Sequence, residues 1–323
     1  MCNKLPLDLK SCVAIEQATA LLPAITVIDL NDHLICFFTG RDPSGRRAFE
    51  GWNWFDDAAM QLGIAIYAVH HGDHALLYDT FTSVPHARWV RDYLERRGIK
   101  RFTVVLSHWH LDHVAGNEVF RDAKIIATQR TYDVLAENRK QIEAGTLWGL
   151  PAISPLVLPN RTFENRLELF VGDIKVELHN VNIHSADTNV LYLPADRILL
   201  AGDALEDSLT FMAEVENLPI HLEKLRELRA MDVERIYPNH GDPEVIRASG
   251  YTKTLIDATG DYISKTLSRC HDANYLSGSM EEYIESTVAM GWVHYYEPYR
   301  GVHAQNLKLV HEFYRDKPIP ALS

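Results

Sequence analysis

Four potential metal ligands lie within six residues of this 323-residue chain: His108, His110, Asp112 and His113, in the segment Ser-His-Trp-His-Leu-Asp-His. In an extended segment, residues i, i+2 and i+4 point to the same side, so His108, His110 and Asp112 face one volume. His113 then turns in beside Asp112. Three imidazoles and a carboxylate form a nitrogen and oxygen site that suits Zn²⁺. Solvated loop histidines rarely gather at this density, so the spacing predicts a metal site.

The composition limits the classes of protein to which such a site can belong. The chain has 32 lysine and arginine residues against 44 aspartate and glutamate residues, a formal net charge of −12, and 46% of its residues are hydrophobic. These values exclude a mostly disordered protein and allow a full core. An acidic surface repels phosphate backbones, and the densest basic cluster, around Arg96 to Arg101, fits a helix end and turn. We therefore expect no nucleic-acid partner.

Features that specify a compartment point to the cytoplasm. No run approaches the ~18 apolar residues that a membrane-spanning helix needs, and the N-terminus lacks the pattern of a signal peptide. The four cysteines, Cys2, Cys12, Cys36 and Cys270, are scattered without a CxxC motif. Unpaired thiols in a reducing compartment explain this pattern better than disulfides. We expect a cytoplasmic protein with no membrane partner.

The elements that must position the histidines begin with a hairpin over residues 64–81, which ends near Asp79. The apolar spacing of the next segment predicts a helix over 85–97, with Gly98 as its C-terminal cap. The β-branched, apolar run 101–106 then predicts a buried strand that leads directly to His108.

The same order of elements occurs a second time. Residues 189–204 form an apolar hairpin that ends in Asp203, a helix is expected over 220–231, and a short strand over 235–237 leads to His240. This repeat suggests two β/α halves that face each other across a shared site.

The remaining segments of the sequence predict further strands and helices. We expect a hairpin at 25–39, a strand and helix at 124–135, a hairpin at 166–183 around Gly172-Asp173, and C-terminal helices at roughly 243–271, 279–291 and 300–315. Residues 141–165, which include Trp148, are irregular, and a loop of this length in a compact domain is usually functional or mobile.

Several aromatic and histidine residues have two interpretations. The C-terminal stretch contains Trp292, His294, Tyr295, Tyr296, Tyr299, Arg300 and His303. These side chains either pack between helices or form a wall of a substrate pocket, and the same choice applies to Trp148. We expect His70, His71 and His74 to lie at an exposed hairpin turn, and His179 to be a packed or surface residue rather than a ligand.

The segment from His108 to His113, written His-x-His-x-Asp-His, resembles the signature of the metallo-β-lactamase superfamily. The other parts of that signature follow in order: His184 in Ile-His-Ser-Ala-Asp-Thr, Asp203 in Leu-Leu-Ala-Gly-Asp-Ala and His240 in Tyr-Pro-Asn-His-Gly-Asp-Pro. Asp79 is similar to the family's early aspartate, which orients metal ligands from behind. The resemblance spans about residues 25–245.

The resemblance implies an α/β fold, an αβ/βα sandwich of two mixed β-sheets flanked by helices. Residues 1–245 would form this catalytic domain, and residues 246–323 would form a helical C-terminal extension packed on the same domain. This architecture agrees with the two facing halves that the repeated elements suggest.

The resemblance also implies a ligand set. One metal would bind His108, His110 and His184, the other would bind Asp112, His113 and His240, and Asp203 would bridge the two. Two Zn²⁺, two aspartates and a bridging hydroxide leave a local charge of about +1, and such a site lowers the pKa of bound water towards ~7. The bridging hydroxide would be the nucleophile, and Asp112 is the expected catalytic residue that orients it and relays its proton. Iron or manganese could replace zinc.

An aspartate at position 203 favours some branches of the superfamily over others. True β-lactamases typically have a cysteine or serine there, whereas glyoxalase II, lactonases and related esterases resemble this chain. Lactonases of acyl-homoserine lactones usually have a tyrosine three residues later, where this chain has Glu206. We therefore expect a binuclear zinc-dependent hydrolase of a small ester, lactone or thioester, with a small-molecule substrate and a possible homodimer. A mononuclear iron sulfur dioxygenase is the first alternative, and a β-lactamase is the second.

Overall fold

The protein folds into two mixed β-sheets with helices on their outer sides, and the computed structural model describes residues 25–42, 44 and 46–319. The first sheet has seven strands in chain order: β1 (Thr26–Asn31), β2 (Leu34–Thr39), β3 (Ile64–His71), β4 (His74–Tyr78), β5 (Arg101–Val105), β6 (Lys124–Thr128) and β7 (Arg161–Phe163). Strands β1 to β4 pair antiparallel, and β4 to β7 pair parallel.

The second sheet has five strands in the order β12-β11-β10-β9-β8. They are β8 (Arg166–Val171), β9 (Ile174–Asn180), β10 (Asn189–Leu193), β11 (Ile198–Gly202) and β12 (Arg235–Pro238). Strands β8 to β11 pair antiparallel and β11 pairs parallel with β12. The predicted sandwich of two mixed sheets is therefore confirmed.

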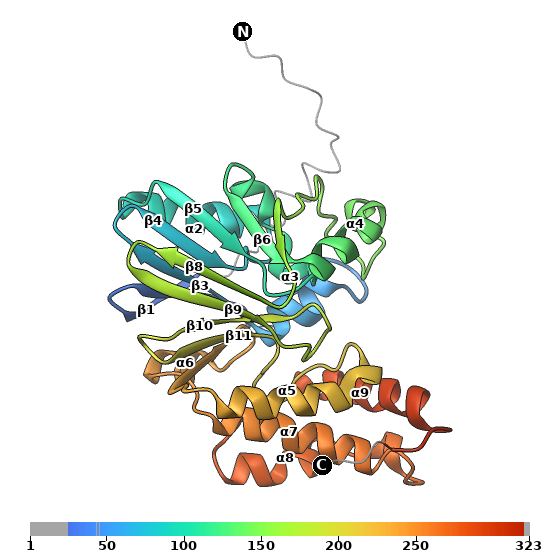
Figure 1. The fold of residues 1–323 in the computed structure, drawn as a ribbon. Helices are drawn as coiled ribbons and strands as arrows, with labels where there is room; N and C mark the ends of the chain where they lie inside the picture. The colour runs from blue at the N-terminus through green and yellow to red at the C-terminus, as the bar shows by residue number, and fades with distance from the viewer. Residues whose placement is uncertain (1–24, 43, 45, 320–323) are drawn as a thin grey trace.

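Helices lie on both sides of the pair of sheets. In Figure 1, α2 and α4 lie above the first sheet, and α5, α7, α8 and α9 lie together below the second. The helices and short helical turns are η1 (Phe55–Met60), α2 (Val84–Arg96), α3 (Leu111–Val114), η2 (Asn117–Phe120), α4 (Gln129–Ala144), η3 (Val215–Asn217), α5 (Leu218–Ala230), α6 (Pro243–Ala248), α7 (Thr254–Ser268), η4 (Tyr275–Ser277), α8 (Met280–Ala289) and α9 (Tyr299–Tyr314).

Alternating side chains of the first sheet fill two separate cores. On β2, Ile35 and Phe37 join the cluster beneath α2, whereas Cys36 and Phe38 face the second sheet. This alternation follows from the period of two along a strand, here with both faces buried. The cluster that Cys36 and Phe38 join also takes in residues of the C-terminal helices, among them Ile263.

The repeated order of elements corresponds to a repeated topology. In the first half, the antiparallel pair β3 and β4 leads through α2 to β5, which lies parallel to β4. In the second half, the antiparallel pair β10 and β11 leads through α5 to β12, which lies parallel to β11. In each half, the last strand runs parallel to its neighbour and is followed within three residues by a predicted metal ligand, His108 after β5 and His240 after β12.

Three expectations about the elements need correction. The helix expected over 243–271 is two helices, because Gly250 has φ +75° and the backbone of Tyr251 pairs with that of Ile236 between α6 and α7. Helix α4 continues to Ala144, so the irregular segment is shorter than 141–165. Strand β7 and the helical turn η1 were not anticipated, because three-residue strands and single turns leave little periodicity in a sequence.

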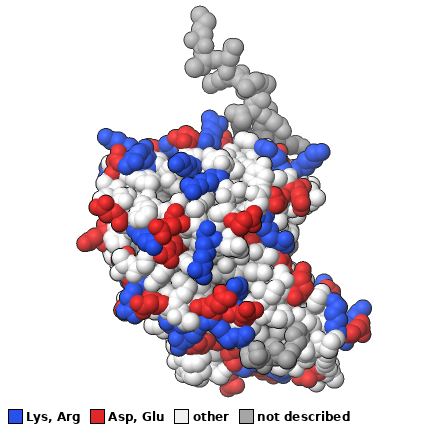
Figure 2. Space-filling model, in the orientation of Figure 1, with Lys and Arg blue, Asp and Glu red and all other residues white. Residues whose placement is uncertain are grey.

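The surface and the cysteines agree with parts of the sequence-based expectations. Cys36 and Cys270 are buried free thiols, and Cys2 and Cys12 lie outside the described residues. Basic and acidic side chains alternate on the face in Figure 2, without a continuous basic area. Within the described residues, no helix has the length and apolar character that crossing a membrane requires.

Candidate metal centre

The seven predicted ligands meet in one buried cluster, although they come from five places in the chain. His108 and His110 follow β5, Asp112 and His113 belong to α3, and the other three follow β9, β11 and β12: His184, Asp203 and His240. The side chains form two groups whose potential ligand atoms lie within 4.8 Å of one another, His108, His110, His184 and Asp203 in one and Asp112, His113 and His240 in the other. No predicted ligand is left outside the cluster.

A glycine allows the two sheets to approach closely enough for this to happen. Gly202, the last residue of β11, has φ +56°, and a Cβ atom there would lie 3.0 Å from the Cβ of Ser107. A hydrogen bond also joins the two sheets here: Asn189 N, at the start of β10, donates to the carbonyl of Ser107, after β5, at 2.9 Å. The residue after Gly202 is Asp203 and the residue after Ser107 is His108, so this contact brings the two ligands together.

Asp203 lies between the two groups. Its Oδ2 is 3.1 Å from His113 Nε2 and 3.4 Å from His240 Nε2 on one side, and 3.6 Å from His108 Nε2 on the other. Asp112 Oδ2 completes the second group at 3.3 Å from His240 Nε2. One carboxylate oxygen therefore faces both groups, as a bridging ligand must.

These separations fit divalent cations. Tetrahedral coordination with bonds of about 2.0–2.1 Å places ligand atoms roughly 3.3 Å from one another. The pair His184 Nε2 and His110 Nδ1, at 3.0 Å, and the distances around Asp203 bracket that value. Two buried polar atoms that point into the cluster, His108 Nε2 and Asp203 Oδ1, have no hydrogen-bond partner among the described residues. Buried polar atoms without partners are costly, and a cation would satisfy them.

Hydrogen bonds behind the cluster orient the imidazoles. His113 Nδ1 donates to Asp79 Oδ2 at 2.9 Å, so Asp79 lies where the resemblance implies. His184 Nδ1 donates to the carbonyl of Phe211 at 2.8 Å, and His240 Nδ1 donates to that of Gly63 at 2.5 Å. Each of these bonds leaves Nε2 free and directed at the cluster, which is the usual arrangement behind metal-ligating histidines.

One positioning residue, Asn239, was missed from the sequence. Asp79 also accepts from Ser107 N at 2.7 Å and from Asn239 Nδ2 at 2.6 Å, so its carboxylate is fully engaged while buried. Asn239 directly precedes His240, which is the only sequence signal that could have drawn attention to it. Asp79 and His184 themselves have φ +71° and +72°. Such backbone conformations are costly for residues other than glycine and cluster at functional sites.

The electrostatics of the metal-free cluster favour a cation. Burial lowers the pKa of His108 and of His110, and neighbouring imidazoles add to the shift. Burial opposes protonation of His113 and His240 as well, but Asp203 and the other carboxylates outweigh it and raise the pKa of both. The carboxylates therefore stabilise positive charge at these two imidazoles, and a metal ion bound there would replace the protons.

Glu206 lies beside the ligand cluster, and its side chain is hydrogen-bonded to two other residues. Its carboxyl group is buried, and burial together with Asp203 raises its pKa to about 8. Oε2 accepts from the hydroxyl of Tyr299 at 3.0 Å and Oε1 accepts from Phe211 N at 2.9 Å. Position 206, where the resemblance to lactonases would imply a tyrosine, thus carries a carboxyl group that is hydrogen-bonded to Tyr299 of α9.

A cavity of about 560 Å³ opens onto the ligands His110, Asp112, His184, Asp203 and His240. Its walls include Trp148 from the irregular segment and Pro298, Gly301, Val302, Gln305 and Leu309 from the C-terminal region. Both segments therefore line the cavity. The residues highlighted in the C-terminal sequence, from Trp292 to His303, do not line it. Packing fits the buried Tyr299 and His303, whereas Tyr295 is exposed.

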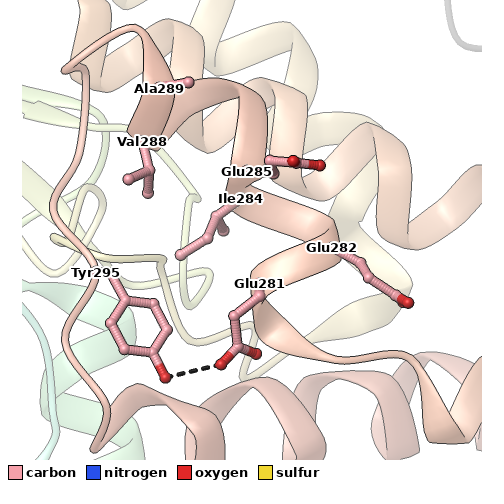
Figure 3. A pocket seen from close by; sticks show the side chains of 7 residues that line it. All are labelled: Glu281, Glu282, Ile284, Glu285, Val288, Ala289 and Tyr295. Carbon is pink, nitrogen blue, oxygen red and sulfur yellow. Dashed lines mark hydrogen bonds between the residues drawn. The ribbon is translucent and has the colours of Figure 1, made fainter.

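The remaining histidines and a second hollow lie apart from the centre. His179 is 3.2 Å from Glu177 on β9, and His71 is exposed at the turn between β3 and β4. A hollow over α8 lies beside Tyr295, whose hydroxyl donates to Glu281 at 2.9 Å (Figure 3). It shares no lining residue with the cavity at the ligand cluster.

The family model of the metallo-beta-lactamase superfamily matches residues 60–240, more than half of the chain, from the last residue of η1 to His240. The chain belongs to this superfamily. Among its curated relatives, lactamase-like protein aptB of Emericella nidulans is 26% identical over 235 residues, 70% of this chain and 61% of that protein. The beta-lactamase-like protein 2 homolog of Caenorhabditis elegans is 27% identical over 139 residues, 43% of this chain and 41% of that protein. Both matches thus cover less than two thirds of the relative.

Solved structures of metallo-beta-lactamases share the fold at low sequence identity. The enzyme from Pontibacter korlensis has a TM-score of 0.56 at 16% identity, covering 75% of this chain and 99% of that chain. VMB-1 has a TM-score of 0.57 at 18% identity, covering 75% and 97%. At such identities the similarity concerns the fold alone, and activity has to be argued from the site.

Proposed function

We propose that this protein is a binuclear zinc-dependent hydrolase that cleaves a carbonyl substrate: an ester, a lactone or a thioester. The observation that carries the proposal is the position of Asp203 Oδ2, which lies 3.1 Å from His113 Nε2 and 3.6 Å from His108 Nε2. A single cation would need only one of the two ligand groups. Five imidazoles and two carboxylates supply enough nitrogen and oxygen donors for two zinc ions.

The side chains at the cavity have distinct roles in this proposal. Two bound zinc ions would polarise the substrate carbonyl and lower the pKa of a water molecule. Asp112 belongs to both the second ligand group and the cavity wall, so its carboxylate can orient the attacking water and accept its proton. Asp79 and Asn239 hold His113 in place from behind, and His240 is held by the carbonyl of Gly63.

The charges of the cavity wall argue against a β-lactam substrate, although the relatives and fold neighbours carry lactamase names. β-Lactam antibiotics have a carboxylate beside the scissile amide, and a binding site would pair it with a cationic side chain. Of the described residues that line the cavity, none is lysine or arginine, and three acidic residues outside the ligand set are present: Asp57, Glu206 and Glu214. A mononuclear iron dioxygenase would leave Asp112, His113 and His240 without a function.

The experiment that tests the proposal is metal analysis followed by a substrate panel. The protein purified without added metal is expected to contain two zinc ions per chain, and activity should be lost with a chelator and restored by zinc. Activated esters, thioesters and lactones should be cleaved with higher kcat/KM than β-lactams, and phosphodiesters should be the poorest substrates. One iron per chain that added zinc does not change, or a preference for penicillins, would contradict the proposal.

A further inference from the structure

The cavity beside the ligand cluster is lined by an unusual share of the chain's tryptophans. The chain has six tryptophans, and four of them line this one cavity: Trp52, Trp54, Trp109 and Trp148. Phe211 and Leu62 add further apolar surface. Tryptophan side chains bury large apolar areas and stack on flat rings, so a wall built from four of them favours a flat apolar ligand.

The aromatic wall stands directly against one pair of ligands. The rings of Trp109 and Trp148 lie 4.6 Å apart between centroids, and both face His110, at 5.0 and 5.1 Å. Phe211 lies 5.8 Å from the ring of His184. A group bound against this wall would therefore place an attached carbonyl next to the metal ligands rather than at a remote subsite.

The wall is held in place at a cost in backbone conformation. Trp148 has φ +57°, in the left-handed region, which is unfavourable for a residue with a Cβ atom. The conformation is maintained because Trp54 N donates to the carbonyl of Trp148 at 3.0 Å, and because Gly149 packs against Asn53. The indole nitrogen of Trp54 in turn donates to the carbonyl of Pro151 at 3.1 Å. The surrounding contacts maintain this strained conformation. Such strain clusters at functional sites, so it points to a function for the Trp148 side chain.

The acidic residues of the cavity wall already have partners within the protein. Asp57 forms two short contacts with Arg47, at 2.6 and 2.8 Å, and Glu214 pairs with Arg130 at 3.2 Å. Glu206 is bonded to Tyr299 and to Phe211 N. Since none of the described residues that line the wall is lysine or arginine, the wall away from the ligand cluster offers neither a cationic side chain for an anionic ligand nor an unpaired carboxylate for a cationic one.

The opposite wall, formed by α9, leaves the cavity open. Gly301 lines it, and a Cβ atom built there would meet nothing within 4 Å. Val302 and Leu309 of the same helix are apolar, and Gln305 is uncharged. The resulting volume of about 560 Å³ falls in the range that holds a drug-sized molecule and far exceeds what an acetyl group would fill.

We infer that this cavity binds an uncharged, bulky aromatic acyl group, and that the natural substrate is an ester, lactone or thioester that carries one. The inference rests on the proposed function for the bond that is cleaved. It does not rest on it for the binding of the aromatic group. An aromatic cation held by cation–π contacts with the tryptophans is a different ligand class and one outcome of the test below.

Binding is tested first, with a probe that has no bond to hydrolyse. Isothermal titration calorimetry of the metal-loaded protein would compare 2-naphthyl methyl ketone with two derivatives, a 6-sulfonate and a 6-trimethylammonium. We expect the neutral ketone to bind at least tenfold more tightly than either derivative. Equal or tighter binding of a charged derivative, or no measurable binding of the ketone, would overturn the inference.

Variants that reshape the cavity without touching a ligand provide the control. Gly301→Phe, which fills the open space, and Trp148→Ala, which removes the stacking partner, should each weaken ketone binding about tenfold. Ala304→Phe changes an exposed residue of the same helix that does not line the cavity, so it should bind the ketone as the wild type does. Zinc content, which should stay constant in all three variants, separates a loss of the cavity from a loss of the fold. Unchanged ketone binding in Gly301→Phe would place the ligand elsewhere and refute the inference.

Turnover supplies the second readout. With 4-nitrophenyl esters, kcat/KM is expected to be at least tenfold higher for the 2-naphthoate than for the acetate. Gly301→Phe should lower the ratio of the naphthoate value to the acetate value about tenfold, whereas Ala304→Phe should leave this ratio unchanged. Tight ketone binding without turnover of any ester, lactone or thioester would overturn the proposed hydrolase and leave the assignment of the cavity intact.

Discussion

The hydroxyl group of Tyr299 donates a hydrogen bond of 3.0 Å to Oε2 of Glu206, although 93 positions separate the two residues in the chain. Both side chains are buried. The bond joins the first turn of α9 to the loop after Asp203, so the C-terminal helices are tied to the surroundings of the candidate metal centre.

Removing the Tyr299 hydroxyl should therefore destabilise the protein. In Tyr299→Phe, the Glu206 side chain loses one of its two hydrogen-bond donors, keeps the amide of Phe211 and remains buried, which costs about 1–3 kcal/mol. Urea unfolding monitored by circular dichroism measures this loss. Tyr295→Phe is the matched control, because its hydroxyl contacts Glu281 at the exposed surface and its removal should cost less than about 0.5 kcal/mol. Equal stability of the two variants would contradict a structural role for the buried bond.

Asp79→Asn should weaken metal binding while the fold persists. The carboxylate accepts from His113, Ser107 and Asn239, and an amide can accept from them less strongly and cannot balance positive charge on the imidazole. We expect zinc affinity to fall by ~10–100-fold, the usual effect of a group that hydrogen-bonds a metal ligand. Competition with a chromophoric chelator measures it. Asp73→Asn, in the turn between β3 and β4, should leave the affinity unchanged; an Asp79 variant with wild-type affinity would remove Asp79 from the site.

His110→Ala should lower the metal content and abolish most activity. His110 Nδ1 lies 3.0 Å from His184 Nε2. The neighbouring histidines are themselves ligands, and the other rings beside His110 belong to Trp109, Trp148 and Phe211, which cannot replace a zinc ligand. The expected result is about one zinc per chain by elemental analysis, with activity lower by orders of magnitude. His179→Ala, which alters a strand residue paired with Glu177, serves as the control and should retain both metals. Two tightly held zinc ions in His110→Ala would show that this residue is not a ligand.

Gly116→Ala should destabilise the segment that carries Asp112 and His113. A Cβ atom at Gly116 would lie 2.0 Å from the carbonyl oxygen of Thr80 and 2.4 Å from the Cβ of Ala87, so the backbone must shift. Overpacking of this kind costs about 1–3 kcal/mol or more. Thermal unfolding should show a lowered Tm, whereas Gly301→Ala, where a Cβ meets nothing, should keep or slightly raise it. A Gly116 variant as stable as the wild type would mean that the α3 region adapts freely.

The segment before α9 should contribute stability that depends on pH. His294 Nδ1 donates to the buried Asp207 at 2.9 Å, and this bond raises the pKa of His294, with Asp242 adding to the shift and Arg41 opposing it. A raised histidine pKa means that the stabilisation is fully present below the unfolded value near 6.5 and is lost as the pH rises through the folded value. The difference in unfolding free energy between wild type and His294→Gln, which does not titrate, should be larger at pH 6 than at pH 9. A difference that is constant across this range would exclude a charged His294.

The ligand set could be predicted from the chain because its motifs resemble the superfamily signature in order, and because several of the ligands follow strands that have their own local signal. The alternation of His108, His110 and Asp112 after a buried β-branched run specifies one site at short range, and the repeat of hairpin, helix and strand places Asp203 and His240 at the matching edge of the second sheet. Chain direction and side-chain alternation are local properties, so no knowledge of the tertiary structure was needed to place these residues.

The cavity and its charges were decided only by the tertiary structure. Trp52, Trp148 and Gly301 carry no shared motif, and they meet because η1, the segment after α4 and α9 pack around the same edge of the two sheets. The same holds for Asn239 with Asp79, 160 positions apart, and for Tyr299 with Glu206. Contacts between distant segments depend on how whole layers pack, and hydrophobic periodicity records only which face of an element is buried, not which neighbour it meets. For this reason the sequence by itself determined the metal-binding chemistry, whereas the packing of distant segments determined the shape and polarity of the substrate cavity.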